Sequence, residues 1–296
     1  SDDMSLGLLT YGPDGQPVPG AAESWTVSDD GMTYTFKIRD HNWSDGTPVT
    51  AQDFIAGWQR LLDPALGAEY ASLLYIIEGA EDVNTGKDGA KLAATAVDDH
   101  TLKVKLTAPA PYFLAQLTHQ TAFAIPRHTV EKYGKDWVKP ENIVVNGPYK
   151  LVEWVPNVHT KLVKNEEFYD AKNVPIDEVI YYAYEDRTAM QNRFRANELD
   201  VARDIASEQI SWLRDNLSDS LRIAPYAGIY YYAIRTDKEK FTDPRVRKAL
   251  SLAINREAGL CFMERPALWR EGRRSQETYG RGRLWAGQSV EIHPAV

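Results

Sequence analysis

Residues 42–64, NWSDGTPVTAQDFIAGWQRLLDP, carry the local signals from which the fold can be worked out. Asp45 and Gly46 predict a tight turn, because both residue types favour turn conformations. Thr50 is placed to cap a helix, and Asp53, three residues later, comes close to completing a capping box. The stretch therefore predicts a turn followed by a capped helix.

The apolar side chains of this helix fall on one stripe, which indicates a face buried against another element. They are Phe54, Trp58, Leu61 and Leu62. The pair at 63–64, Asp-Pro, ends the pattern, since proline cannot continue a helix. No side chain in the stretch has obvious catalytic chemistry, so we interpret it as scaffold.

Strands are expected on both sides of this unit, because apolar and polar residues alternate there with a period of two. The apolar positions are Tyr34, Phe36 and Ile38 before the helix, and Leu102, Val104 and Leu106 after it. Such alternation is typical of a sheet with one buried face.

Further signals follow in the second half of the chain. We expect a hairpin with arms at 149–154 and 158–163, a strand within 176–186, a helix over 187–196 and an aromatic strand within 227–237. Asp243 as cap and Pro244 at the first helical position predict another helix. Its apolar face is formed by Val246, Ala249, Leu250 and Ala253.

Composition limits the classes of function. The chain has 296 residues, 43% of them hydrophobic, and a net charge of -8 with a pI near 5.4. An acidic surface repels phosphate backbones, so we expect no nucleic-acid partner. No apolar run is long enough to cross a bilayer. No signal peptide is recognised at the start, which leaves a cytosolic protein or one whose signal lies upstream.

The sequence lacks the motifs of several well-known enzyme and metal-binding classes. It has no nucleophile elbow, zinc-protease motif, P-loop or dinucleotide fingerprint. Its six histidines are scattered, and its single cysteine, Cys261, excludes a disulfide framework. Carboxylate pairs arise by chance among 42 acidic residues. We expect no catalytic residues, no metal site and no cofactor. Tyr230–Tyr232 are compatible with either a ligand cleft or core packing.

The composition changes near the end of the chain. Residues 257–296 contain six Arg and no Lys, and we expect no strand or helix after Arg283. One interpretation is an Arg-rich surface tail. The other is a segment that does not belong to the upstream fold, for example after a shift of the reading frame.

Five segments occur in an order that identifies a family: PVPGAAESWTVSDDGMTYTFKIRD, WSDGTPVTAQDFIAGWQRLLDP, DDHTLKVKL, NGPYKLVEW and TDPRVRKALSLAINRE. Together, over residues 7–256, they resemble the extracytoplasmic solute-binding proteins of family 5, the dipeptide, oligopeptide and nickel class of ABC importers. The resemblance implies an α/β periplasmic binding protein-like fold (type II, cluster C), a Venus flytrap whose two lobes close on an extended peptide.

The resemblance also implies a domain organisation, in which this chain corresponds to an incomplete flytrap. The expected segments are a remnant of lobe I (1–5), the class-specific β-rich domain (6–129), lobe I (130–227), the start of lobe II (228–256) and the atypical tail (257–296).

In that family the peptide is held mainly through its backbone, while hydrated pockets accept varied side chains. The ligand-binding positions carried over to this chain are Tyr70, Asp204, Tyr226, Gly228 and Tyr231. Asp204 departs from the pattern, in which this polar position is usually an amide. Tyrosine suits such a site, since it offers a broad apolar face and one hydroxyl at low entropy cost.

The groups that grip both ends of the peptide in this family have no match here, so the chain resembles about half of a binding protein, and we expect weak peptide binding. Its expected partners are short peptides and the membrane permease subunits of an importer, with a periplasmic or lipid-anchored parent. Unpartnered apolar residues of the last helix suggest a non-native dimer. The alternatives are another ligand of the class (dipeptide, murein peptide, nickel or haem) or a glycan-active enzyme.

Overall fold

The structure is a computed structural model that describes residues 3–12, 14–203, 205–224 and 233–254, together with the backbone of strands at 265–269 and 288–294. The chain divides into two compact units. Residues 1–180, with 274–283 and 293–296, form the first, and residues 181–273, with 284–292, form the second.

The first unit contains most of the strands. They are β1 (Leu9–Tyr11), β2 (Pro17–Pro19), β3 (Ala22–Val27), β4 (Thr33–Ile38), β5 (Ala94–Asp98), β6 (Thr101–Lys105), β7 (Tyr149–Val155), β8 (His159–Lys164) and β9 (Ile176–Ala183), whose last residues lie in the second unit. Its helices are α1 (Ala51–Leu61), α2 (Ala80–Asn84), α3 (Phe113–Gln116) and α4 (Arg127–Tyr133), with 3-10 turns η1 (Ala71–Leu74), η2 (Gln120–Ala122), η3 (Gly134–Val138) and η4 (Ala171–Asn173).

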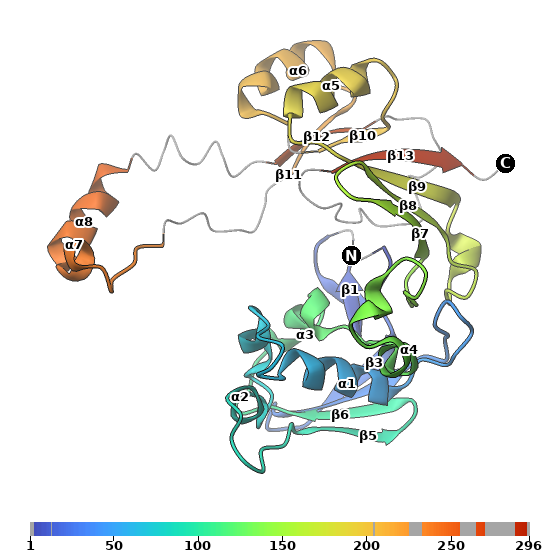
Figure 1. Cartoon of the computed structure of the whole chain (residues 1–296), viewed down its shortest axis with the longest axis vertical. Coiled ribbons are helices and arrows are strands. Elements are labelled where there is room, and N and C mark those ends of the chain that lie inside the picture. Colours follow the sequence, from blue (N-terminus) through green and yellow to red (C-terminus); the bar gives the residue numbers. More distant parts are fainter. Residues whose placement is uncertain are drawn as a thin grey trace. The chain divides into compact units, whose positions relative to one another are not determined.

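A four-stranded antiparallel sheet in the order β3-β4-β6-β5 forms the centre of this unit. Its inner face carries the alternating apolar residues predicted from the sequence, all of them buried: Tyr34, Phe36, Ile38, Leu102, Val104 and Leu106. Helix α1 lies along this face (Figure 1) and packs on β5 and β6. The predicted strands and the amphipathic helix between them are therefore confirmed.

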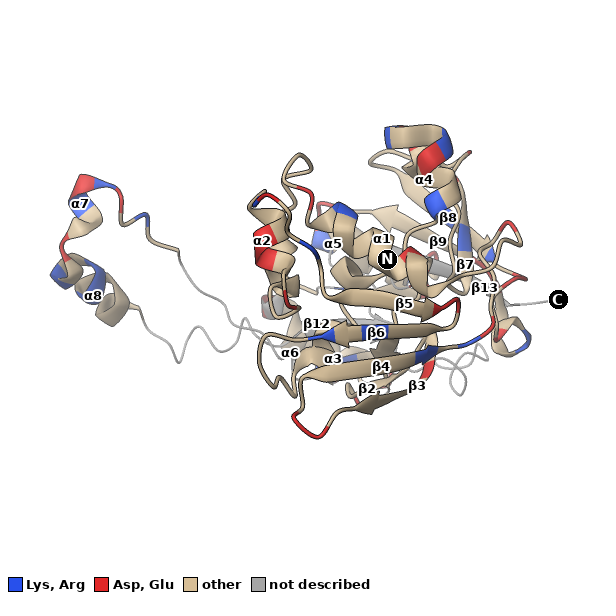
Figure 2. Cartoon of the chain, turned by 90° about the horizontal axis from the view of Figure 1, so that it is seen from below, with Lys and Arg blue, Asp and Glu red and all other residues tan. Residues whose placement is uncertain are grey.

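The opposite face of the sheet is polar. Cross-strand register places Thr33 beside Lys105 and Thr35 beside Lys103, and Figure 2 shows basic positions along β6. Hydroxyl and lysine side chains are suited to a half-solvated antiparallel sheet, whose other face is covered. The alternation read from the sequence thus has a direct structural cause.

The predicted hairpin is also confirmed. Strands β7 and β8 pair antiparallel, with Val155 opposite His159. Asn157 at the bend adopts a positive φ of 61°, a conformation that asparagine tolerates better than most residues. The start of β7 is held by the N-terminal segment, since the Tyr149 amide donates to the Asp3 carbonyl oxygen at 2.9 Å.

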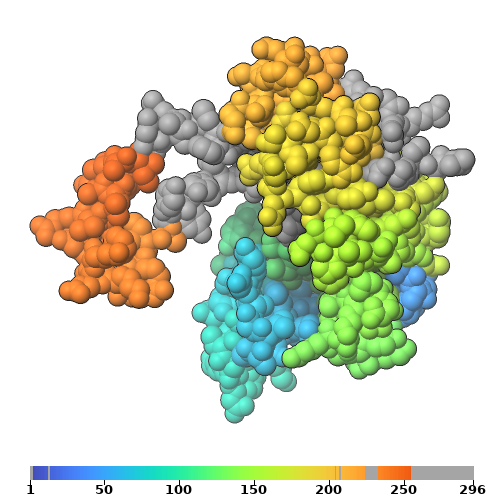
Figure 3. Space-filling view, turned by 45° about the horizontal axis from the view of Figure 1, so that its top comes forward, coloured from blue at the N-terminus to red at the C-terminus, as the bar shows by residue number. Residues whose placement is uncertain are grey.

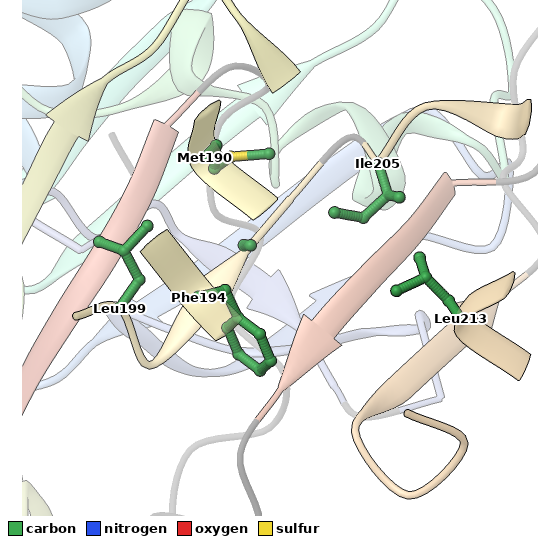
Figure 4. Close-up of a cluster of buried hydrophobic side chains, with 6 residues drawn as sticks. Met190, Phe194, Leu199, Ile205 and Leu213 are labelled. Carbon is green, nitrogen blue, oxygen red and sulfur yellow. The ribbon is translucent and has the colours of Figure 1, made fainter. Parts of the chain in front are cut away.

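The second unit is built around two helices and short strands. Its elements are α5 (Arg187–Arg195), β10 (Val201–Ala202), η5 (Ser207–Gln209), α6 (Ile210–Asn216), β11 (Leu221–Ala224), α7 (Glu239–Thr242), α8 (Pro244–Ala253), β12 (Arg265–Trp269) and β13 (Gln288–Pro294). Helices α5 and α6 close over an apolar cluster drawn in Figure 4, whose members are Met190, Phe194, Leu199, Ala202, Ile205 and Leu213. Figure 3 shows the residues around α5 and α6 (yellow to orange) as one packed body.

Helix α8 begins as predicted. The Asp243 carboxylate accepts the Arg245 amide at 2.8 Å, and Pro244 occupies the first helical position. Arg247 ties α8 to α7 by donating to the carbonyl oxygens of Phe241 and Thr242 at 2.7 and 2.9 Å. The aromatic strand predicted within 227–237 lies largely outside the described residues.

One prediction about the tail is wrong. Strand β13 follows Arg283 and pairs with β10, while β12 pairs with β10 and β11. The period-two pattern missed in the sequence is short: Val290 and Ile292 alternate with Glu291 and His293. A pattern of only two apolar residues becomes a strand when partner strands supply its backbone hydrogen bonds. The frame-shift origin of the tail stays a prediction.

Candidate functional site

Of the five predicted ligand-binding residues, Tyr70 is the one that the structure describes. Asp204, Tyr226, Gly228 and Tyr231 lie outside the described residues. The candidate site is therefore built here from Tyr70 and its surroundings in the first unit.

Tyr70 immediately precedes η1, and its carbonyl oxygen accepts the Leu73 amide at 3.1 Å. Tyr70 is 57% exposed, more than any other aromatic residue among the exposed large hydrophobic residues of the described part of the chain. The backbone is thus held in a turn while the ring and hydroxyl remain accessible to a ligand.

The Tyr70 ring lies beside the imidazole of His119, with ring centroids 5.7 Å apart and planes tilted by 48°. His119 caps η2, where its Nδ1 lies 3.0 Å from the Thr121 hydroxyl oxygen. The two rings are in contact although Tyr70 and His119 lie far apart in the sequence. Sequence reasoning missed His119, because no local spacing connects it to Tyr70.

Helix α1 forms the base on which this pair stands. The Trp58 indole N–H donates to the Ala122 carbonyl oxygen at 2.9 Å, and both residues are fully buried. The Ile125 amide donates to the Asp53 carbonyl oxygen at 3.2 Å. Gly57 allows close approach, since a Cβ there would lie 2.5 Å from the Phe123 carbonyl oxygen. The helix of the stretch 42–64 thus holds the turn that carries His119.

The N-terminus of α1 is organised by the buried carboxylate of Asp53. It accepts the Thr50 amide at 2.9 Å and the Trp43 indole N–H at 3.4 Å. It also forms an ion pair with Arg127 at the start of α4, at 2.8 Å. The capping interaction of Asp53 was predicted, whereas its partners Trp43 and Arg127 were not. A carboxylate with several donors is well satisfied when buried.

Two titratable groups in the adjoining turn have shifted pKa values. Burial lowers the pKa of the His41 imidazole, whose Nδ1 lies 2.9 Å from the Arg39 carbonyl oxygen. Burial raises the pKa of Asp45, but hydrogen bonds from the Thr47 amide at 3.0 Å and from His128 at 2.8 Å outweigh it and hold that pKa below its usual value.

The side chains of the site offer several kinds of contact to a ligand. Within the described ranges, no group of three or more His, Cys, Asp or Glu side chains is placed to hold a metal ion. Among the same residues, no helix is both long and apolar enough to cross a membrane. An exposed tyrosine beside a histidine offers an aromatic face, a hydroxyl and an imidazole to a ligand.

Comparison with known proteins identifies the family to which the chain belongs. Residues 16–260 match the sequence profile described as bacterial extracellular solute-binding proteins, family 5 (middle). The chain is 40% identical over 262 residues to the periplasmic oligopeptide-binding protein OppA of Salmonella typhimurium, and 38% identical to a probable deoxycholate-binding periplasmic protein of Escherichia coli. These alignments cover 87% and 86% of this chain and 48% of each relative.

Solved structures of similar proteins also match this chain over about half of their length. The Haemophilus influenzae protein OppA in complex with the peptide RPPGFSPFR has a TM-score of 0.83 and 37% identity, over 87% of this chain and 51% of that chain. The Escherichia coli murein tripeptide-binding protein has a TM-score of 0.81 and 35% identity, over 86% and 51%. The chain therefore spans about half the length of the relatives it matches.

Proposed function

The chain belongs to the bacterial extracellular solute-binding proteins of family 5, and from that membership we propose that it contributes to binding short peptides for an oligopeptide ABC importer. The sequence predicts a periplasmic binding protein-like fold, and the solved relatives have that fold. The chain covers about half of each of them. The family consists of solute-binding proteins rather than enzymes.

The observation that carries the proposal is the exposed Tyr70 ring on a turn held by buried interactions. It lies at the position at which the sequence resemblance expects a ligand contact. A tyrosine with a fixed backbone and a 57% exposed side chain provides contact area at low entropy cost. On this proposal Tyr70 supplies one ligand contact from the first unit, and Asp204, Tyr226, Gly228 and Tyr231 are the other proposed contacts.

The remaining features of the proposal come from the family. The parent protein acts in the periplasm or as an envelope lipoprotein, and delivers its ligand to membrane permease subunits. We propose the domain boundaries that the resemblance implies, with the class-specific domain at 6–129, lobe I at 130–227 and the start of lobe II at 228–256. On this proposal the chain binds its ligand without catalysing a reaction.

We expect the residues present in this chain to bind peptides weakly by themselves. Groups that hold the two ends of a peptide are among those without a match in this sequence. A dissociation constant of about 1 mM, or −4.1 kcal/mol, is the expected scale.

Isothermal calorimetry with trialanine to penta-alanine tests the proposal, with deoxycholate as the competing ligand because one relative is described as binding it. We expect millimolar peptide binding that weakens in Tyr70→Ala and is absent for deoxycholate. Micromolar peptide binding would contradict the expected impairment. Deoxycholate binding without peptide binding would overturn the peptide proposal, and glycosidase turnover abolished by one carboxylate substitution would favour an enzyme.

A second part of the proposal concerns self-association. The apolar face of α8 is exposed, with Val246 at 39% and Leu250 at 44%. Such a face favours burial against another copy of the chain. We expect a non-native dimer through α8.

A further inference from the structure

We infer that Trp58 and Gly57 of α1 are positioning residues for the ligand contact made by Tyr70, acting through the turn at residues 119–123. The inference rests on the proposed function for its consequence on binding. The positioning itself is a property of the free protein and can be measured without a ligand.

The first step is the bond from Trp58 to the turn. The indole N–H donates to the Ala122 carbonyl oxygen at 2.9 Å, and both residues are 0% exposed. A buried carbonyl oxygen that loses its donor is left without water to replace it. If the indole N–H is removed, we therefore expect the turn at residues 119–123 to move, so that the Ala122 carbonyl oxygen can find another donor.

The second step is the close approach at Gly57. An added Cβ would lie 2.5 Å from the Phe123 carbonyl oxygen, a separation that real Cβ atoms essentially never show. The constraint comes from the neighbouring backbone, since Gly57 is not among the residues with a positive φ. Glycine is needed here so that the turn can lie directly against the helix.

The third step connects the turn to the ligand contact. The Ala122 amide donates to the His119 carbonyl oxygen at 2.9 Å, so displacement of Ala122 moves His119. The His119 imidazole lies 5.7 Å from the Tyr70 ring. Tyr70 is anchored at its backbone by η1, so its ring direction depends on the ring beside it. Trp58, Ala122, His119 and Tyr70 form one continuous path.

Positioning matters because an exposed tyrosine can adopt several rotamers. A ring already held in its binding direction avoids the entropy cost of being ordered by the ligand. The stretch 42–64 thus acts on binding without contacting the ligand.

The test uses the full chain with its sixteen tyrosines replaced by 3-fluorotyrosine, and follows the ¹⁹F NMR signal of Tyr70. Tyr70→Phe assigns the signal of Tyr70, and His119→Ala shows where that signal lies without the neighbouring imidazole. We expect Trp58→Phe and Gly57→Ala to shift the Tyr70 signal toward its position in His119→Ala. Two variants with different mechanisms keep the test valid if one of them fails to fold.

Trp43→Phe is the matched control. Trp43 is equally buried in the same stretch, but its indole N–H is directed to Asp53 rather than to the turn. We expect this variant to leave the Tyr70 signal unchanged. A Tyr70 signal unaffected by Gly57→Ala, by Trp58→Phe or by His119→Ala would overturn the inference, as would an equal shift in Trp43→Phe.

Trialanine titration followed at the same signal gives the consequence for binding. Loss of positioning should weaken binding by about tenfold in Trp58→Phe, the scale expected for a displaced tyrosine anchor, and not in Trp43→Phe. If trialanine never shifts the Tyr70 signal of the unmodified chain, the proposed function fails, while the ¹⁹F shifts of the free variants still decide the positioning. Equal affinity in both tryptophan variants would overturn the binding consequence.

Discussion

Helices α1 and α8 carry the same local signals and differ in what lies against their apolar faces. Both begin with a capping residue, Thr50 and Asp243 respectively, and both have an apolar stripe. In α1 the stripe is buried on the four-stranded sheet, with Phe54 and Trp58 at 0% exposure. In α8 the described residue Leu250 is 44% exposed. Caps and periodicity predict a helix, but they do not predict its partner.

The largest difference between the two helices should appear when an apolar side chain is removed. Phe54→Ala should lower the free energy of unfolding by about 3–5 kcal/mol, because it leaves a cavity in a packed core. Leu250→Ala should change it by no more than about 0.5 kcal/mol. Urea denaturation followed by tryptophan fluorescence measures both, and similar losses for the two variants would break the comparison.

The caps should differ by a smaller amount. Asp53→Asn should cost about 2 kcal/mol, because it weakens the ion pair with the half-exposed Arg127 as well as the helix cap. Asp243→Ala, at a partly exposed cap outside a packed core, should cost less.

Arg127→Met separates the two contributions at Asp53 in the same denaturation experiment, because it removes the ion pair and leaves the cap. An equal cost for Asp53→Asn and Asp243→Ala would contradict the assigned role of Asp53.

As the pH falls, the free energy of unfolding of the first unit should decrease before the cap of α8 is protonated. The pKa of His41 is lowered by burial from its usual value of 6.5. As the pH falls, the unfolded chain therefore binds a proton at His41 before the folded chain does. The contribution of His41 to the free energy of unfolding is complete above pH 6.5 and is lost as the pH falls toward the folded-state pKa. The slope reaches at most about 1.4 kcal/mol per pH unit.

Denaturation of the unmodified chain and of His41→Gln between pH 7 and pH 5 measures this effect. The variant should lack the slope. An unchanged slope in His41→Gln would assign the acid sensitivity to other groups. Asp45 and Asp243 titrate in a lower window, since their pKa values lie below 3.8.

The smallest effect on stability should come from charges placed on α8. Val246→Lys and Leu250→Lys should change the free energy of unfolding of the first unit by less than about 0.5 kcal/mol. They should nevertheless abolish self-association in sedimentation velocity. A dimer that persists in both variants would show that α8 is not the contact.

Much of the first unit could be predicted from the sequence because its signals are local. The turn at Asp45 and Gly46, the cap at Thr50 and the alternation through Phe36 and Val104 each act over a few residues. The family resemblance rested on the order of such segments and agrees with the matched profile over residues 16–260.

The contacts of the candidate site could not be predicted in the same way. His119 contacts Tyr70, and Arg127 pairs with Asp53, through contacts between residues that are far apart in the sequence. Such pairs depend on tertiary geometry rather than on spacing along the chain. Strand β13 was missed for a related reason, since its pairing with β10 is non-local.

The most direct test of the central claim, that Tyr70 contacts a peptide, is photo-crosslinking of the full chain with an alanine tripeptide carrying a benzophenone side chain. Mass spectrometry then locates the crosslinked residue. Our account predicts saturable labelling at Tyr70 or in the adjoining residues 119–121, which excess trialanine prevents. Saturable labelling confined to other parts of the chain, or labelling that trialanine does not reduce, would contradict it.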